Sequence, residues 1–129
     1  DQNKSDTHYF VSAGSSSGVL VENNLAALHS TEAGTGFISV GGSGSFVDNN
    51  YGYMPGRPGS CREPDGGGAC IDPRLENTID RNNAGFMRPR ADSLAVDNAA
   101  ADVPVSDDFH GTPRPQGNAP DIGAVERIQ

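Results

Sequence analysis

The sequence predicts an all-β solenoid in which short parallel strands stack from one coil to the next. Three observations indicate this fold. Two similar segments follow each other with a period of about 26 residues, their apolar runs are short, and these runs are rich in Val, Ile and Phe and separated by Gly and Ser. A helix would need a longer run with a 3.6-residue period. A repeat of this length indicates stacked units, each too small to bury its own apolar face.

The two clearest copies of the repeat each contain two apolar runs and end in an asparagine pair. They comprise residues 10–14 with 18–24, and residues 37–41 with 44–50. A weaker third copy is expected at residues 85–99. If the copies stack in register, equivalent strands lie about 4.8 Å apart. Phe10 would then lie over Phe37, and Val21 over Val47, inside the coil.

The asparagine pairs Asn23-Asn24 and Asn49-Asn50 are predicted to occupy equivalent corners. Asparagine tolerates the left-handed backbone of a tight corner, and its side chain can bond to the turn of the next coil. A solvated turn without a stacking role is an equally compatible interpretation of these side chains. The sequence therefore predicts where the corners are but leaves the asparagine contacts open.

One domain with two parts is expected from the length of 129 residues. Residues 1–100 are predicted to form the coils, with a loop insertion at residues 52–70 and a possible helical turn at residues 25–28. Residues 101–129 are predicted to form a Pro-rich closing loop and a terminal strand, DIGAVE, at residues 121–126. The polar start without methionine is typical of a chain from which a signal peptide or an upstream portion has been removed.

The charge balance argues against a nucleic-acid partner. Nine basic residues are scattered among seventeen acidic ones, for a net charge of −8. Phosphate binding needs clustered Lys and Arg, and anionic surfaces are poor partners for the same reason. No run approaches the roughly 18 apolar residues of a membrane helix, so no membrane span is expected.

The two cysteines, Cys61 and Cys70, enclose a glycine-rich stretch and are predicted to form a local disulfide. The alternative, a metal or redox pair, lacks the CxxC spacing and any nearby histidine. Closing a loop of this size contributes about 2.5 to 3 kcal/mol in the chain-entropy model. Such a bond implies an oxidising compartment and thus an extracellular or cell-surface location.

Several motifs in the C-terminal half occur in the order of a known family. They are residues 72–75 (DPRL), 85–86 (GF), 93–97 (SLAVD), 108–117 (DFHGTPRPQG) and 121–126 (DIGAVE). This series resembles the closing region of bacterial right-handed parallel β-helix proteins with a choice-of-anchor Q domain. The resemblance covers residues 70–126 and implies the last coils and closing tail of such a β-helix in a secreted or surface-displayed protein. It implies no chemistry, because β-helices include lyases, glycosidases, adhesins and stalks.

Two positions depart from the family pattern. Leu94 replaces the usual proline, and His110 stands where aspartate is common. The histidine weakens the case for calcium at Asp107 and Asp108, because a hard cation prefers oxygen ligands.

No spacing of titratable residues marks a catalytic site, and no metal or cofactor is expected. A lyase needs a base and a cation for the uronate carboxylate; the basic candidates are Lys4, Arg57, Arg62, Arg81, Arg88 and Arg90. A glycosidase needs two facing carboxylates, for which the candidates are Asp65, Asp72, Asp80, Asp92 and Asp97. The histidines His8, His29 and His110 are isolated from one another. The basic residues are interpreted as solvated surface charges.

The closing tail is predicted to have a structural role. Arg114 and Asp121 lie on either side of a turn and are expected to pair, which would hold the tail, ending at Glu126, against the last coil. Asp97 is expected to cap a turn by bonding backbone amides.

Two functions remain open from the sequence. The first is a structural or binding module of a secreted or cell-surface protein, which serves adhesion, glycan or protein contact, or self-assembly, for instance through residues 52–68. The alternative is the C-terminal part of a carbohydrate-active enzyme, a polysaccharide lyase or glycoside hydrolase, with its catalytic residues upstream. In both cases the short polar segment ahead of Tyr9 is too small to cover a coil. Upstream coils of the same protein or another chain are therefore expected at that end.

Overall fold

The computed structural model of the chain describes residues 9–27, 36–54, 68–100 and 105–129. Within these residues the fold is all-β, with seven short strands and no helix. The strands are β1 (Tyr9–Gly14), β2 (Leu20–Glu22), β3 (Leu25–Ala27), β4 (Gly36–Val40), β5 (Phe46–Asp48), β6 (Asn50–Tyr53) and β7 (Gly68–Cys70). The predicted all-β class is confirmed.

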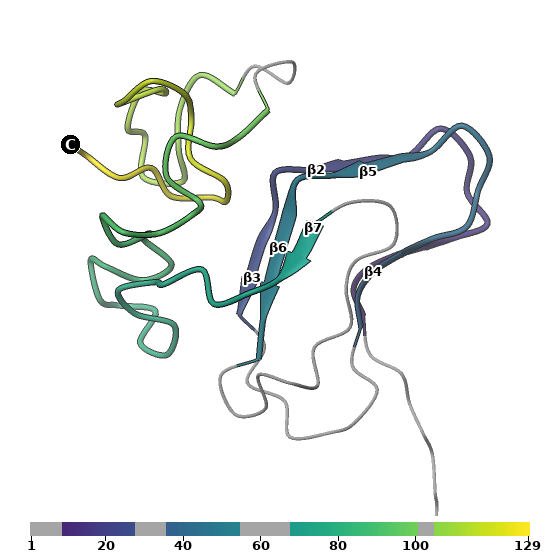
Figure 1. The fold of residues 1–129 in the computed structure, drawn as a ribbon, viewed down its shortest axis with the longest axis horizontal. Helices are drawn as coiled ribbons and strands as arrows, with labels where there is room; N and C mark the ends of the chain where they lie inside the picture. The colour runs from purple at the N-terminus through teal and green to yellow at the C-terminus, as the bar shows by residue number, and fades with distance from the viewer. Residues whose placement is uncertain (1–8, 28–35, 55–67, 101–104) are drawn as a thin grey trace, which may run out of the picture.

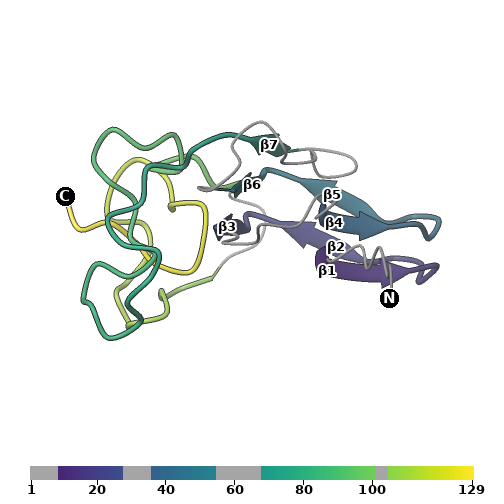
Figure 2. The ribbon, with the colours of Figure 1, turned by 90° about the horizontal axis from the view of Figure 1, so that it is seen from below.

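The strands form three separate parallel sheets. β1 pairs with β4, β2 pairs with β5, and β3 pairs with β6, to which β7 is added. In Figure 1 the strands β2 and β5 nearly coincide, and in Figure 2 the same strands lie one above the other. The chain therefore passes twice through the same three strand positions, and the second pass (β4, β5 and β6) lies on the first (β1, β2 and β3). We call each pass a coil.

The strand register agrees with the repeat spacing seen in the sequence. Val11 lies opposite Ile38, and an irregularity between Ser12 and Gly14 then shortens the offset by one position, so that Gly14 lies opposite Val40. The shorter offset persists in the next sheet, where Val21 lies opposite Val47. The predicted Val21–Val47 stacking is confirmed. The side chains of Phe10 and Phe37 are not among those that the structure describes, so this pair stays a prediction.

The interior of the coils is a small aliphatic core. It consists of the buried side chains of Val21, Ala26, Ile38, Val47 and Met54. Alternate residues of β2 and β5 point the other way, as the period of two in a strand requires. Leu20 and Phe46 are consequently more than half exposed on the outer face.

The corner asparagines form a ladder between the two coils. Asn23 and Asn49 have positive φ values of 57° and 52°, and Asn49 Nδ2 donates to Asn23 Oδ1 at 2.8 Å. The main-chain nitrogen and Nδ2 of Asn24 both donate to Asn50 Oδ1, at 3.0 and 2.8 Å. Asn50 is 2% exposed and donates to the carbonyl oxygen of Val21 at 2.9 Å. Of the two interpretations of these residues, the structure supports the stacking role.

Three predictions about the coils are wrong. Residues 25–28 do not begin a helical turn, because Leu25–Ala27 is strand β3 and pairs with β6. Part of the predicted loop insertion, Gly68–Cys70, is strand β7. The predicted third copy, residues 85–99, forms turns rather than a stacked coil. The place of a third strand is taken by β7, which adds to β6 with Asn50 opposite Gly68.

The C-terminal part, residues 71–100 and 105–129, packs beside the coils and not across their end (Figures 1 and 2). Its contact with the coils is a second apolar cluster, in which outward-pointing Leu25 meets Ala95 and Ile122. Gly123, with a φ of 108°, lies so close that an added Cβ would come within 2.9 Å of Leu25 Cβ. A glycine is needed here for both its conformation and its size.

The predicted terminal strand at residues 121–126 is also wrong, because this segment is irregular. Its main-chain amides donate to carbonyl groups outside any neighbouring strand. Ile122 donates to the carbonyl oxygen of Ala95 at 2.8 Å, and Gly123 donates to that of Asn23 at 2.9 Å. The segment thus joins the tail to the corner of the first coil.

We expect Val47→Asp to destabilise the protein by more than about 3 kcal/mol, because the substitution buries an unpaired charge between the coils. The matched control is the neighbouring Asp48→Asn. Asp48 is exposed and accepts a bond from the Asn49 amide, which asparagine can also accept, so its effect should stay within about 0.5 kcal/mol. Urea unfolding measures both, and equal tolerance at the two positions would show that the register is wrong.

Candidate functional site

The closing tail is organised around the buried side chains of Arg114 and Glu126. Arg114 Nε lies 3.4 Å from Glu126 Oε2, and the two side chains are 8% and 1% exposed. The guanidinium also donates to two main-chain oxygens, those of Asp121 at 3.2 Å and Gly123 at 2.7 Å. The predicted Arg114–Asp121 pairing needs correction. Arg114 contacts the carbonyl group of Asp121, while its carboxylate partner is Glu126.

The carboxylates of the tail are used to bind main-chain amides. Glu126 accepts bonds from the amides of Gln116 and Asp121, both at 3.0 Å. Asp121 accepts bonds from the amides of Asp97 at 2.9 Å and Arg127 at 2.7 Å. Asp97 in turn accepts a bond from the Ala119 amide at 3.3 Å, as expected for a residue that caps a turn. These acids satisfy a backbone that has no sheet partner.

Burial is the largest influence on the pKa of Asp121 and raises it. The bonds from Asp97 and Arg127 lower this pKa, and the charges of Glu126 and Asp97 raise it further. The net effect is a pKa above the ordinary value of an aspartate. The ionised form of Asp121 is therefore held at some cost among other acids.

Asp108 has the opposite balance. Burial raises its pKa, but bonds from the amides of Glu126, Thr112 and His110 outweigh this and hold the pKa below its ordinary value. The His110 and Thr112 amides both lie 2.7 Å from Oδ1, and the Glu126 amide lies 3.0 Å from Oδ2. From the sequence, Asp108 is considered only as a calcium ligand. The glycine three residues later, Gly111, which ends a turn with a φ of 80°, is the sequence signal for its structural role.

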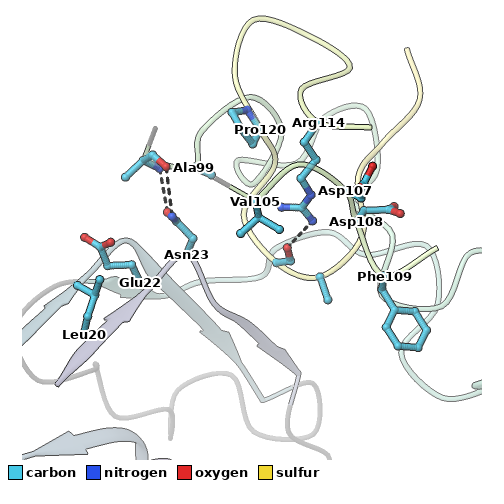
Figure 3. Close-up of a pocket in the computed structure, with 13 residues that line it drawn as sticks. Leu20, Glu22, Asn23, Ala99, Val105, Asp107, Asp108, Phe109, Arg114 and Pro120 are labelled. Atoms are coloured by element: carbon cyan, nitrogen blue, oxygen red, sulfur yellow. Dashed lines mark hydrogen bonds between the residues drawn. The ribbon is translucent and has the colours of Figure 1, made fainter. Parts of the chain in front are cut away.

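A groove of about 490 Å³ separates the outer face of the first coil from this tail. Figure 3 shows Leu20 and Asn23 on the coil side, Arg114 and Phe109 on the tail side, and Val105 between them. The groove is lined by Leu20, Glu22, Asn23, Ala99, Ala100, Val105, Asp107, Asp108, Phe109, Arg114, Pro120, Gly123 and Ala124. Phe109 is 79% exposed and meets the His110 ring edge-on at 5.3 Å.

Three of the polar groups that line the groove are already engaged in the fold. Asn23 exchanges two bonds with Ala100, at 2.8 and 3.3 Å. Arg114 is held by Glu126 and two carbonyl groups, and Asp108 by three amides. The exposed carboxylate of Asp107 accepts a bond only from the adjacent Ser106 hydroxyl in the described part of the chain. The groove therefore offers apolar surface with an acidic rim, which suits binding.

The remaining acids and bases named from the sequence are dispersed. Arg74 pairs with Asp92 at 2.8 Å, and Glu76 lies 3.6 Å from Arg88 and 3.2 Å from Arg127. Partly exposed pairs of this kind contribute at most about 1 kcal/mol. Across residues 9–27, 36–54, 68–100 and 105–129, no cluster of three or more His, Cys, Asp or Glu side chains could hold a metal ion.

Several candidate residues from the sequence lie outside the residues that the structure describes. These are Lys4, His8, His29, Arg57, Cys61, Arg62 and Asp65. Cys70 ends β7 and packs against the aliphatic core of the coils. Because Cys61 is not described, the Cys61–Cys70 disulfide stays a prediction.

In the described part of the chain no helix has the length and apolarity needed to cross a membrane. Searches of protein-family models, curated proteins and solved structures found no match to this chain.

We expect Asp108→Asn to lower the free energy of unfolding by about 2 to 4 kcal/mol at neutral pH, because an amide cannot replace a carboxylate that accepts three bonds. The lowered pKa of Asp108 means that its contribution is present above the unfolded pKa of about 3.9 and is lost as the pH falls through the folded pKa. The difference in the free energy of unfolding between variant and parent should therefore shrink as the pH falls below about 3.9. Urea unfolding at several pH values measures both effects.

The neighbouring Asp107→Asn is the control, because Asp107 is exposed and holds no main-chain amide of the described tail. It should change stability by no more than about 0.5 kcal/mol. A difference for Asp108→Asn that stays constant with pH would contradict the role assigned to its charge.

Proposed function

We propose that this chain is the coil-and-tail region of a right-handed parallel β-helix that serves as a structural or binding module of a secreted or cell-surface protein. The observation that carries the proposal is the parallel pairing in all three sheets at an offset of 26 to 27 residues. Strands from successive coils pair in parallel in three different sheets, and a buried asparagine ladder connects the same two coils. Stacking of identical corners and strands is typical of solenoids.

The use of the buried polar groups supports a structural role. The charged centre of the tail, Arg114 with Glu126, binds main-chain groups of Asp121, Gly123 and Gln116. Asn23 and Asn49 connect the coil corner to the tail through Ala100 and Asn98. These contacts keep the tail against the outer face of the coils, which leaves the groove as a binding surface. The motif order that resembles the choice-of-anchor Q domain points in the same direction.

The proposal includes a partner for the edge of the stack that is formed by the first coil. In the described part of the chain β1 and β2 each pair with one strand, β4 and β5. Among the described residues no strand covers the other edge of β1 or β2, and such an edge can pair with a further strand. Upstream coils of the same protein or another chain would satisfy this edge.

Duplicating one coil tests the β-helix proposal. We expect a second copy of residues 9–35, inserted directly ahead of Tyr9, to stack on the first coil, since Tyr9 pairs with Gly36, the residue that follows the copied segment. Amides of the original β2 (Leu20–Glu22) should then gain protection in hydrogen exchange, because their strand becomes internal. The same segment in scrambled order is the control. Exchange of the true copy as fast as the scrambled one would refute the stacking.

The secreted or surface location is tested through the cysteines. We expect intact-mass measurement without reduction to show Cys61 and Cys70 bonded to each other, with two thiols appearing only after a reductant is added. Replacing both with serine should lower stability by about 2 to 3 kcal/mol. Two free thiols in protein secreted through an oxidising compartment would remove this support for the location.

A further inference from the structure

We propose that the groove receives the exposed loop at residues 78–81 of a second copy of this chain, which forms a head-to-tail contact between molecules. This contact extends the proposed module toward self-assembly, but it depends only on the groove and the loop. Failure of the coil duplication would leave it standing, and its own failure would leave the β-helix proposal standing.

The groove presents apolar side chains that nothing in the described structure covers. Leu20 and Val105 are each 55% exposed, and Phe109 is 79% exposed. Phe46 lies opposite Leu20 on the next strand of the same outer face and is exposed as well. Contiguous exposed apolar surface in a concave site is typical of a docking surface. An occupant should therefore bring an apolar side chain into the groove.

The charge of the groove indicates what else the occupant carries. Among the described residues, Arg114 is the one cation that lines the groove, and it pairs with Glu126. Asp107 and Glu22 line the groove, and Asp48 lies opposite Glu22 on the outer face of the coils. At the contact itself, an acidic side chain would be repelled and a basic side chain beside an apolar one would be attracted.

The loop at residues 78–81 has this combination. Ile79 is 82% exposed, the highest value among the exposed large hydrophobic side chains of the described chain. Arg81 is exposed, and none of the ion pairs found among the described residues involves it. The loop thus offers an apolar side chain and, close to it in the same turn, a basic side chain.

The loop is held in shape before any contact. Asn77 Oδ1 accepts bonds from the amides of Ile79 and Asp80, both at 2.9 Å. Asp80 Oδ1 accepts a bond from the Asn82 amide at 2.9 Å. A preformed loop loses little conformational entropy on docking.

The loop and the groove lie at different places on the first coil. Ile79 and Arg81 border Ala27, at the far end of β3, whereas the groove borders Leu20 to Asn23. The loop of one molecule is thus presented to the groove of another, and each molecule keeps one loop and one groove free. Contacts of this kind are heterologous and either close into rings or continue as chains.

Sedimentation velocity over concentrations from about 10 µM to 1 mM tests the contact. We expect wild-type protein to associate as its concentration rises. Ile79→Ser should weaken this association at least about tenfold, because the apolar anchor is lost. Leu94→Ser is the matched control, since Leu94 is 60% exposed elsewhere, and it should leave association unchanged.

Reversing one charge in the loop and one in the groove gives the decisive test. Arg81→Glu and Asp107→Lys should each weaken self-association at least about tenfold, because each places like charges across the contact. A mixture of the two variants should associate again, since the reversed loop of one suits the reversed groove of the other and the native loop and groove also remain. Circular dichroism and thermal unfolding confirm that each variant is folded.

Wild-type protein that sediments as a monomer throughout this range would overturn the proposal. Association that Ile79→Ser leaves intact, or that the mixture of charge variants does not restore, would also overturn it, because another surface would then carry the contact.

Discussion

The asparagine corner is the constraint on which the rest of the structure depends. Asn50 is buried, and a buried amide group without partners is costly. Within its own coil Asn50 has one partner, the carbonyl oxygen of Asp48. Its other partners are in place only when the second coil lies on the first in one register: Asn24 donates to its oxygen, and its nitrogen donates to the carbonyl oxygen of Val21. A shift of the register by a single position would break these bonds and turn Val47 out of the core. The ladder and the aliphatic core therefore select the same register.

The tail depends on this corner in turn. An irregular segment has no strand to satisfy its amides, so side-chain carboxylates must do so. Asp108, Asp121 and Glu126 perform this task, and Arg114 pairs with the carboxylate of Glu126. The tail reaches the coils beside this corner, at Asn23 and Leu25. These acids, which in the sequence alone could be taken for catalytic residues, are thus engaged in holding the fold.

The groove is a consequence of this lateral packing. The coil contributes the outward-pointing residues of β2, and the tail contributes Phe109 and Val105, so neither part forms a groove alone. Because Arg114 and Asp108 are consumed by the fold, what remains exposed is apolar surface and the acidic rim at Asp107. Exposed apolar surface with a polar rim is typical of protein interfaces.

The sequence by itself determined the all-β class, the spacing of the repeat and the pairing of Val21 with Val47, because strand periodicity and repetition are local patterns. It also marked Arg114 as a residue that holds the tail. It did not determine that Leu25 points outward, that Glu126 is the partner of Arg114, or that residues 85–99 form turns instead of a coil. Each of these depends on which distant segment covers a given face. Leu25 is apolar whether it fills the coil or meets Ile122, and only the docked tail decides between the two.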